Sequence, residues 1–572
     1  RILQAMVPVA KHAPASVFAA EFLTTLVEHG VEHIVLSPGA RSQALALVAA
    51  ELERRGDVKL HVRIDERVAG FVALGIAVET RTPAVVITTS GSAVANLHPA
   101  VLEAHHAGVP MIVVTADRPE ELREIGSNQT THQHDIFGPA VRLSVDEPAP
   151  VPGATAQRRG SDLAAQAWEA ATDHFAPGPV HLNVALREPL SSEISVRDVR
   201  DVFIERTHIG LPTVVAELNR GPRTIVIAGA DAGPRAEEVA HEGGWPLIAE
   251  VTSGSRYGRN LIPAYRELLA NAELTSLIDR IIVFGHPTLS REVPALIGDS
   301  STGIQTIVVR GAAPEGYNPG LNVSSFVNDV VVEPGETDKE WLGLWILNGR
   351  DAFERYEATA IDAALATAPN VSASRSESIE EKKAFLAAEL AASRVKISRE
   401  LLVDAVWRST WPHDRLVFAA SRLIRVADKF VGGKKITVHA NRGLAGIDGN
   451  IGTGIGIALA TENALTRVVV GDLAALHDAG SLLFGTQEVR PRVQVIVGND
   501  GGGTIFDALE VGQTASPENM DRVFLTPQSV NLEALATAYG WAYSKVSTVS
   551  ELERALTGAG EGPELVEVEL ER

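Results

Sequence analysis

Short apolar runs recur along the chain, and most of them end in glycine or a polar residue. The runs at 468–470 and 493–497 are β-branched and show no alternation of polar with apolar residues. That pattern is typical of strands buried on both faces of a parallel sheet. Further strands of this kind are predicted at 33–36, 60–64, 84–88, 111–115, 179–185, 224–230, 246–250, 280–285, 306–310, 416–420 and 438–440.

Segments with helical periodicity lie between many of these runs. Phe18, Phe22 and Leu26 share one face of a helix predicted over 16–28. Other helices are predicted over 44–53, 68–78 and 474–484, the last as the crossover between two strands. This alternation predicts an α/β fold with three doubly wound parallel-sheet domains. The predicted units are a first domain at 14–195, a central Rossmann-like domain at 205–370, a linker with an exposed helix at 371–396 and a last domain at 397–572, with 148–160 as a surface connection.

Composition narrows the classes of function. The 572 residues include no cysteine, which excludes disulfides, thiolate metal sites and cysteine nucleophiles. No apolar run approaches the length of about 18 residues that a membrane span needs. No N-terminal signal pattern is visible, so the expected compartment is the cytoplasm. A net charge of −21 argues against binding to nucleic acid or an anionic membrane. An anionic substrate must therefore be held by locally gathered arginines.

Polar residues follow two of the buried strands in the last third of the chain. Asp472 comes after the run at 468–470, and Asn499 with Gly501 follows 493–497. Ligands of parallel sheets bind at the carboxyl ends of the strands, so these residues should meet on one rim. Carboxylate, amide and carbonyl oxygens suit Mg²⁺, which takes its other ligands from water and phosphates. The alternative is two ordinary strand ends with turn residues.

The first part of the chain has two similar loops. Arg41 stands in a glycine-containing loop between a strand and a helix, where backbone N–H groups can bind an anion. Glu66 lies between Asp65 and Arg67 at the start of an alanine- and glycine-rich helix. Alternatively, the first loop is only a connection and the second only a solvated helix start. The glycines at 229–233 have the wrong spacing for a dinucleotide fingerprint, so no dinucleotide is expected in the central domain.

Taken together, these motifs resemble those of thiamine-diphosphate (ThDP) enzymes. Asp472 and Asn499 resemble the motif that anchors the diphosphate, although Leu473 and Gly498 depart from the usual Gly and Asn. A strand followed by Glu66, a small-residue helix and the segment 89–96 resembles the pyrimidine-side signature. The segments 37–42, 65–67, 116–119 and 126–129 make the resemblance narrower. They are similar to the 2-succinyl-5-enolpyruvyl-6-hydroxy-3-cyclohexene-1-carboxylate synthases of menaquinone biosynthesis (the MenD family), end to end and most strongly at 33–138 and 438–506.

The resemblance implies a ThDP-enzyme fold with pyrimidine-binding, central and diphosphate-binding domains. It implies that Glu66 hydrogen-bonds the aminopyrimidine and activates the cofactor. It also implies that Asp472, Asn499 and the Gly501 carbonyl hold Mg²⁺ (or Mn²⁺). The other cofactor-binding residues implied are Ser90, Gly91, Asn96, Ile447, Gly471, Leu473, Ala474 and Gly502.

The activity implied is decarboxylation of 2-oxoglutarate and conjugate addition of the resulting succinyl-semialdehyde carbanion to isochorismate. Both substrates are dianions, and guanidinium groups grip carboxylates bidentately. The residues implied for isochorismate are Arg41, Arg118, Asn128, Gln129 and Arg291. Those implied for 2-oxoglutarate are Ser421, Arg425 and Arg442. The resemblance further implies a homodimer or homotetramer with active sites between chains. Two alternatives are another ThDP lyase or synthase, similar to acetohydroxyacid synthase, and an inactive relative that serves as a binding or regulatory subunit.

Overall fold

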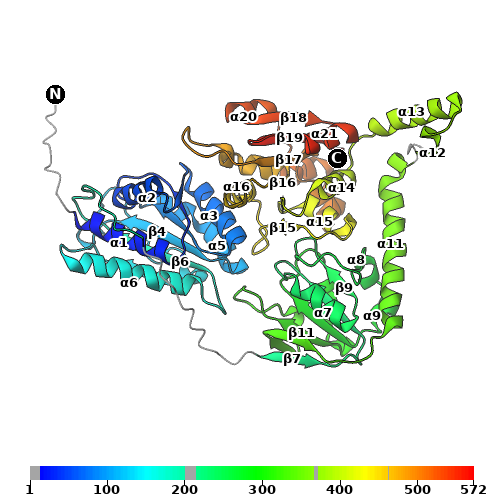
Figure 1. The fold of residues 1–572 in the computed structure, drawn as a ribbon, viewed down its shortest axis with the longest axis horizontal. Helices are drawn as coiled ribbons and strands as arrows, with labels where there is room; N and C mark the ends of the chain where they lie inside the picture. Colours follow the sequence, from blue (N-terminus) through cyan, green and yellow to red (C-terminus); the bar gives the residue numbers. More distant parts are fainter. Residues whose placement is uncertain (1–12, 200–213, 366–370, 462) are drawn as a thin grey trace.

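The chain forms three parallel-sheet domains that meet at their edges (Figure 1). The computed structural model describes residues 13–199, 214–365, 371–461 and 463–572. The predicted domain limits at 205 and 370 lie outside these ranges. Among the described residues, no helix is long and apolar enough to cross a membrane.

The first domain is built on a six-stranded sheet with the order β2-β1-β3-β4-β6-β5, in which every pairing is parallel. Its strands are β1 (His33–Leu36), β2 (Lys59–Val62), β3 (Ala84–Thr88), β4 (Met111–Asp117), β5 (Ser144–Glu147) and β6 (Pro179–Ala185). Its helices are α1 (Pro14–Glu28), α2 (Gln43–Arg55), α3 (Glu66–Thr80), α4 (Ser92–Asn96), α5 (His98–Ala107) and α6 (Ala154–Ala171).

Successive residues of these strands enter two different cores. Val85 and Ile87 of β3 pack in the core under α1, α2 and α6, whereas Val86 packs in the core under α3 and α5. A strand must be apolar at every position to fill both layers. This explains the unalternated runs of the sequence and confirms the doubly wound fold.

The central domain has a five-stranded parallel sheet with the order β12-β11-β10-β8-β9. Its strands are β8 (Thr224–Ala228), β9 (Leu247–Ala249), β10 (Arg280–Phe284), β11 (Gln305–Val309) and β12 (Ser325–Val327), with a separate pair β7 (Val215–Leu218) and β13 (Asp329–Val332). Its helices are α7 (Arg235–Gly243), α8 (Tyr265–Leu269), α9 (Ala272–Thr275), α10 (Glu292–Gly298) and α11 (Lys339–Leu365). The order reverses between β8 and β10, so their carboxyl ends open a crevice at a topological switch point.

The last domain repeats the design of the first, with the strand order β15-β14-β16-β17-β19-β18 and parallel pairings throughout. Its strands are β14 (Arg415–Phe418), β15 (Thr437–His439), β16 (Thr466–Gly471), β17 (Val493–Asn499), β18 (Ala542–Val546) and β19 (Glu564–Glu569). Its helices are α14 (Arg399–Ser409), α15 (Arg422–Phe430), α16 (Asn450–Ala460), α17 (Asp472–His477), α18 (Glu510–Thr514), α19 (Pro517–Asn519), α20 (Leu532–Ala538) and α21 (Val549–Thr557).

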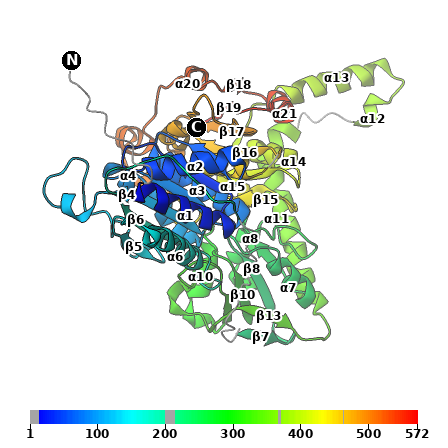
Figure 2. The same ribbon diagram turned by 60° about the vertical axis from the view of Figure 1, so that its left-hand side comes forward.

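Helices α12 (Val371–Ser374) and α13 (Ile379–Ser393) join the central and last domains. They project away from the three sheets in both views (Figures 1 and 2). Helix α13 has no buried residue. This agrees with the exposed helix that the sequence predicts between the two domains.

Helices α3 and α16 join the first and last domains through one shared core. A Cβ on Gly75 would lie 2.0 Å from the carbonyl oxygen of Thr453, and a Cβ on Gly456 would lie 2.2 Å from that of Val72. Only glycine permits backbones to approach so closely. The small-residue composition of α3 therefore permits its close contact with the last domain.

Two predicted segments are wrong in detail. The segment 148–160 is a connection only up to Gly153, because α6 begins at Ala154. The helix predicted over 474–484 is instead the short α17 followed by a 3₁₀ turn, η5 (Ala479–Leu482). The cause is Asp478, whose buried carboxylate accepts hydrogen bonds from the N–H groups of Ile451 and Gly452, at 2.7 and 3.0 Å. The helix ends where this side chain turns toward α16.

Candidate active site

The ends of β16 and β17 bring the predicted metal ligands to one rim. Gly471 pairs with Gly498 in register, so Asp472 and Asn499 follow from adjacent strands. Asp472 begins α17 and is 7 % exposed. Burial raises its pKa to about 6, although the N–H groups of Leu473 and Gly502 hydrogen-bond the carboxylate and act in the opposite direction. The raised pKa means that burial disfavours the charged carboxylate, and a bound cation would stabilise that charged form.

The amide of Asn499 has a fixed orientation. Its Nδ2 donates to Glu567 at 2.9 Å, so its Oδ1 faces the loop and lies 3.4 Å from the nitrogen of Gly501. Gly501 has φ 78°, which turns the peptide sharply after the strand. Within the described ranges no group of three or more His, Asp or Glu side chains could hold a metal. One carboxylate, one amide oxygen and one carbonyl nevertheless fit Mg²⁺ that also binds a diphosphate.

Glu66 is the first residue of α3, and the residue after it, Arg67, contacts the end of the last domain's α17. Asp65 caps the helix by accepting from the nitrogens of Arg67 and Val68, at 2.9 and 3.3 Å. Arg67 in turn donates to the carbonyl oxygen of His477 at 3.0 Å. Within the described part of the chain, no hydrogen bond or ion pair occupies the Glu66 carboxylate. Its two neighbours are therefore fixed while its own oxygens stay available to a ligand.

The loop that carries Ile447 is held from the first domain. Glu103 of α5 is 4 % exposed and accepts hydrogen bonds from the nitrogens of Gly443 and Leu444, at 2.7 and 2.8 Å. Ile447 lies a few residues further on and is 38 % exposed. A large aliphatic side chain is thus presented on a loop that both domains hold.

Arg118 and its neighbours form the first group of cations. Arg118 follows β4, is 9 % exposed, and donates to Ser90 Oγ and to the Gln129 carbonyl oxygen, the latter at 2.7 Å. Burial and the nearby charge of Arg41 lower its pKa. Gln129 closes the group by donating from Nε2 to the Ser90 carbonyl at 2.9 Å. Gly91 follows Ser90 with φ 81°, and Asn128 and Asn96 lie exposed beside this group of loops.

Arg425, Arg442 and Arg291 form a second group, where the central and last domains meet. Burial lowers the pKa of Arg425, and the charges of Arg266 and Arg291 add to this. The pKa of Arg442 is also lowered, by burial and by the charge of Arg425, although the carboxylate of Glu250 acts in the opposite direction. Repulsion of this kind marks a place where an anion is needed. Ser421, which precedes α15, has φ 116°, a strained conformation of the kind that gathers at functional sites.

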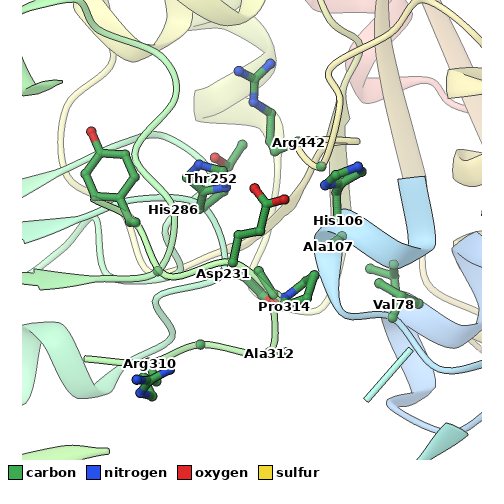
Figure 3. A pocket seen from close by; sticks show the side chains of 18 of the residues that line it. Val78, His106, Ala107, Asp231, Thr252, His286, Arg310, Ala312, Pro314 and Arg442 are labelled. Atoms are coloured by element: carbon green, nitrogen blue, oxygen red, sulfur yellow. The ribbon is translucent and has the colours of Figure 1, made fainter. Parts of the chain in front are cut away.

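A cavity of about 280 Å³ lies where the three domains meet (Figure 3). Its lining includes Val78 and His106 of the first domain, Asp231 and His286 of the central domain, and Arg442 of the last. Asp231 and His286 follow β8 and β10, so the cavity occupies the switch-point crevice. Arg442 thereby connects this crevice with the second group of arginines.

Comparison with known proteins identifies the family. Residues 18–137 match the family described as "Thiamine pyrophosphate enzyme, N-terminal TPP binding domain", and residues 427–568 match its C-terminal TPP binding domain. The 2-succinyl-5-enolpyruvyl-6-hydroxy-3-cyclohexene-1-carboxylate synthase of Leifsonia xyli is 52% identical, over 98% of this chain and 97% of its own. The chain belongs to the MenD family. The synthases of Clavibacter michiganensis, 51% identical over 98% of this chain and 97% of theirs, and Saccharopolyspora erythraea, 34% identical over 98% and 96%, agree with this.

A solved structure shares the fold over nearly the whole chain. Benzoylformate decarboxylase from Polynucleobacter necessarius superimposes with a TM-score of 0.62 at 15% identity, over 97% of this chain and 98% of its own. This likeness shows the fold alone. Together with the two matched domains, it makes the chain a ThDP-dependent enzyme of the MenD family, as the sequence motifs predict.

Sequence reasoning missed several residues that hold the site together. They are Glu103, Asp478, Glu567, Thr288, Glu250 and Asp428. All are buried except Thr288, which is half-buried, and each acts on a distant backbone or side chain. Asp478 and Glu250 lie within a predicted helix and a predicted strand, but nothing in their local sequence indicates a partner in another part of the chain.

Proposed function

We propose that this chain decarboxylates 2-oxoglutarate and adds the remaining four-carbon unit to isochorismate, with ThDP and a divalent cation. The observation that carries the proposal is the pairing of a metal-binding rim at 471–502 with a free glutamate at the start of α3. The family relation supports the substrate pair, because the relatives are named for its product.

The proposed residue roles are those that the family resemblance implies, and the contacts described above support them. Asp472, Asn499 and the Gly501 carbonyl would hold the cation, and Gly471, Leu473, Ala474 and Gly502 would bind the diphosphate. Glu66, Ser90, Gly91 and Asn96 would bind the pyrimidine side of the cofactor, and Ile447 would also contact it. When bound, ThDP supplies a carbon nucleophile and an electron sink for decarboxylation. Glu66 contributes by holding a proton at the aminopyrimidine ring.

The first group of arginines binds one substrate and the second group the other, except that Arg291 of the second group acts with the first. Arg41, Arg118, Asn128 and Gln129, with Arg291, bind isochorismate. Arg425 and Arg442, with Ser421, bind 2-oxoglutarate. In a protein of net charge −21, these local groups supply the cationic surface that dianionic substrates need.

The domain roles and the assembly are part of the same proposal. Residues 14–195 form the pyrimidine-binding domain and 397–572 the diphosphate-binding domain, joined through the central domain. In the same proposal the working enzyme is a homodimer or homotetramer with active sites between chains, as the family resemblance implies. Light scattering on the loaded enzyme gives the molar mass that tests this.

The decisive experiment incubates the protein with 2-oxoglutarate, isochorismate, ThDP and Mg²⁺ and analyses the products by mass. The expected product has the summed mass of the two substrates minus CO₂. Omitting ThDP should abolish it. CO₂ release that does not depend on isochorismate, with no coupled product, would mean that the acceptor is a different molecule. No CO₂ release at all would refute the proposed activity.

A further inference from the structure

The guanidinium of Arg442 is held on one edge only. Its Nε donates to Thr288 Oγ1 at 2.9 Å, and its Nη2 donates to the Thr288 carbonyl oxygen at 3.2 Å. Its Nη1 is buried and has no hydrogen-bond partner among the described residues. Arg442 is only 7 % exposed, so water does not readily compensate for the missing bond. The end formed by Nη1 and the second hydrogen of Nη2 is thus free for a carboxylate, which such an end can bind bidentately.

Thr288 is itself held in place by the carboxylate of Glu250. The Glu250 carboxylate follows β9, is 1 % exposed, and accepts from the nitrogen of Thr288 at 2.9 Å and from that of Leu289 at 2.7 Å. Two N–H groups on one carboxylate fix the peptide that carries Thr288. The Thr288 hydroxyl and carbonyl oxygen are therefore fixed in position before Arg442 meets them.

The same turn leads directly to Ser290 and Arg291. Glu250 therefore helps to position two cations. It fixes Arg442 through Thr288, and it fixes the turn that continues to Arg291. Arg425 lies near both arginines. Its charge lowers the pKa of Arg442, and the charge of Arg291 lowers the pKa of Arg425. The central domain thus contributes one cation, Arg291, and also orients an arginine of the last domain.

We propose that Thr288 is a positioning residue that orients Arg442 so that its free end receives the distal carboxylate of 2-oxoglutarate. This inference rests on the proposed function and names a residue that works through Arg442 without touching the reacting atoms. Thr288 is suited to this role because its side-chain hydroxyl accepts from Nε of Arg442 while its backbone carbonyl oxygen accepts from Nη2. A valine of the same shape keeps the carbonyl and loses the hydroxyl.

The test compares Thr288→Val with Thr288→Ser in the enzyme loaded with ThDP and Mg²⁺. Loss of a hydrogen bond to a charged group corresponds to about tenfold to a hundredfold in affinity. Thr288→Val should raise the KM for 2-oxoglutarate by about that factor and change the KM for isochorismate by less than about twofold. Thr288→Ser retains the hydroxyl and should stay within about threefold of the wild type for both substrates.

A second substrate separates positioning from a general structural effect. 2-Oxobutyrate keeps the 2-oxo acid group and lacks the distal carboxylate. Its kcat/KM for decarboxylation should be the same in Thr288→Val and in the wild type. In an Arg442→Ala background, Thr288→Val should cause no further loss with 2-oxoglutarate, because its effect runs through that arginine.

Each outcome tests either the role of Thr288 or the proposed function. Equal KM values for 2-oxoglutarate in the valine and serine variants would overturn the inference, and so would a parallel loss with 2-oxobutyrate. A wild-type enzyme that does not decarboxylate 2-oxoglutarate would refute the proposed function instead. The two failures are therefore distinguishable.

Discussion

Asp428 gives the sharpest quantitative prediction. Its carboxylate lies on α15, is completely buried, and accepts from the nitrogen of Val251 at 2.9 Å, from Tyr265 Oη at 2.7 Å and from Arg266 Nη2 at 2.6 Å. Arg256 Nη1 lies 3.7 Å away. All four partners belong to the central domain, so one carboxylate joins that domain to the helix that also carries Arg425.

The substitution Asp428→Asn keeps the shape and removes the charge. It leaves two arginines without their anion, and an NH₂ group replaces one acceptor oxygen among donors. Breaking a buried ion pair on one side costs about 3–5 kcal/mol. Urea unfolding slopes are about 1–3 kcal/mol per M and increase with protein size, so with a slope at the upper end of this range the first unfolding transition should move down by roughly 1–2 M urea.

The measurement is urea unfolding followed by tryptophan fluorescence. Three of the seven tryptophans, Trp245, Trp341 and Trp345, are buried in the central domain, so its unfolding contributes strongly to this signal. Several domains need not unfold together, and the first transition is the one to compare. Tyr265→Phe removes one hydrogen bond to the same carboxylate and should shift the midpoint in the same direction by less.

A matched control is the ion pair of Glu51 with Arg54, which lies on the surface of α2. Glu51→Gln should leave the midpoint unchanged, because exposed pairs contribute little. If Asp428→Asn unfolded at the same urea concentration as the wild type, the buried carboxylate would not be what joins the domains. The explanation of why α15 is placed where it is would then be wrong.

Four further predictions concern chemistry and pH. Glu66→Gln should slow turnover by about 10²–10⁴-fold at saturating ThDP; near-normal turnover would remove this residue from catalysis. Asp472→Ala should weaken ThDP binding in the presence of Mg²⁺, and an unchanged dissociation constant would contradict the metal assignment. Arg425→Ala should impair decarboxylation of 2-oxoglutarate and Arg118→Ala the capture of isochorismate, with stopped-flow spectra separating the steps; the reverse pattern would exchange their roles. Burial raises the pKa of Glu79, but hydrogen bonds from a histidine and an arginine outweigh it and bring the pKa down to about 2. The stability this gives is present above the ordinary value of 4.5 and is lost as the pH falls toward 2, so Glu79→Gln should flatten the dependence of stability on pH in that window, and an unaltered acid limb would argue against the pairing.

The sequence alone determined the fold class and the location of the cofactor motifs. Buried parallel strands must be apolar on both faces, so runs such as 493–497 can be recognised as strands from the local sequence. The meeting of the proposed metal ligands Asp472 and Asn499 follows from the rule that strand ends share a rim, which needs no tertiary information beyond strand direction. The same rule applied to Arg41 and Arg118 after β1 and β4.

Only the tertiary structure decided which distant side chains hold the loops in place. Glu103 fixes the Ile447 loop, and Asp478 ends α17, through bonds to backbone N–H groups that carry no sequence signal. The glycines of α3 could be counted in the sequence, but their reason is the carbonyl of Thr453, 2.0 Å from where a Cβ on Gly75 would lie. The physical reason is general. The burial of a strand leaves a repeating pattern of apolar residues in the local sequence. A single hydrogen bond between domains leaves no such pattern, because its two partners come together only when the chain folds.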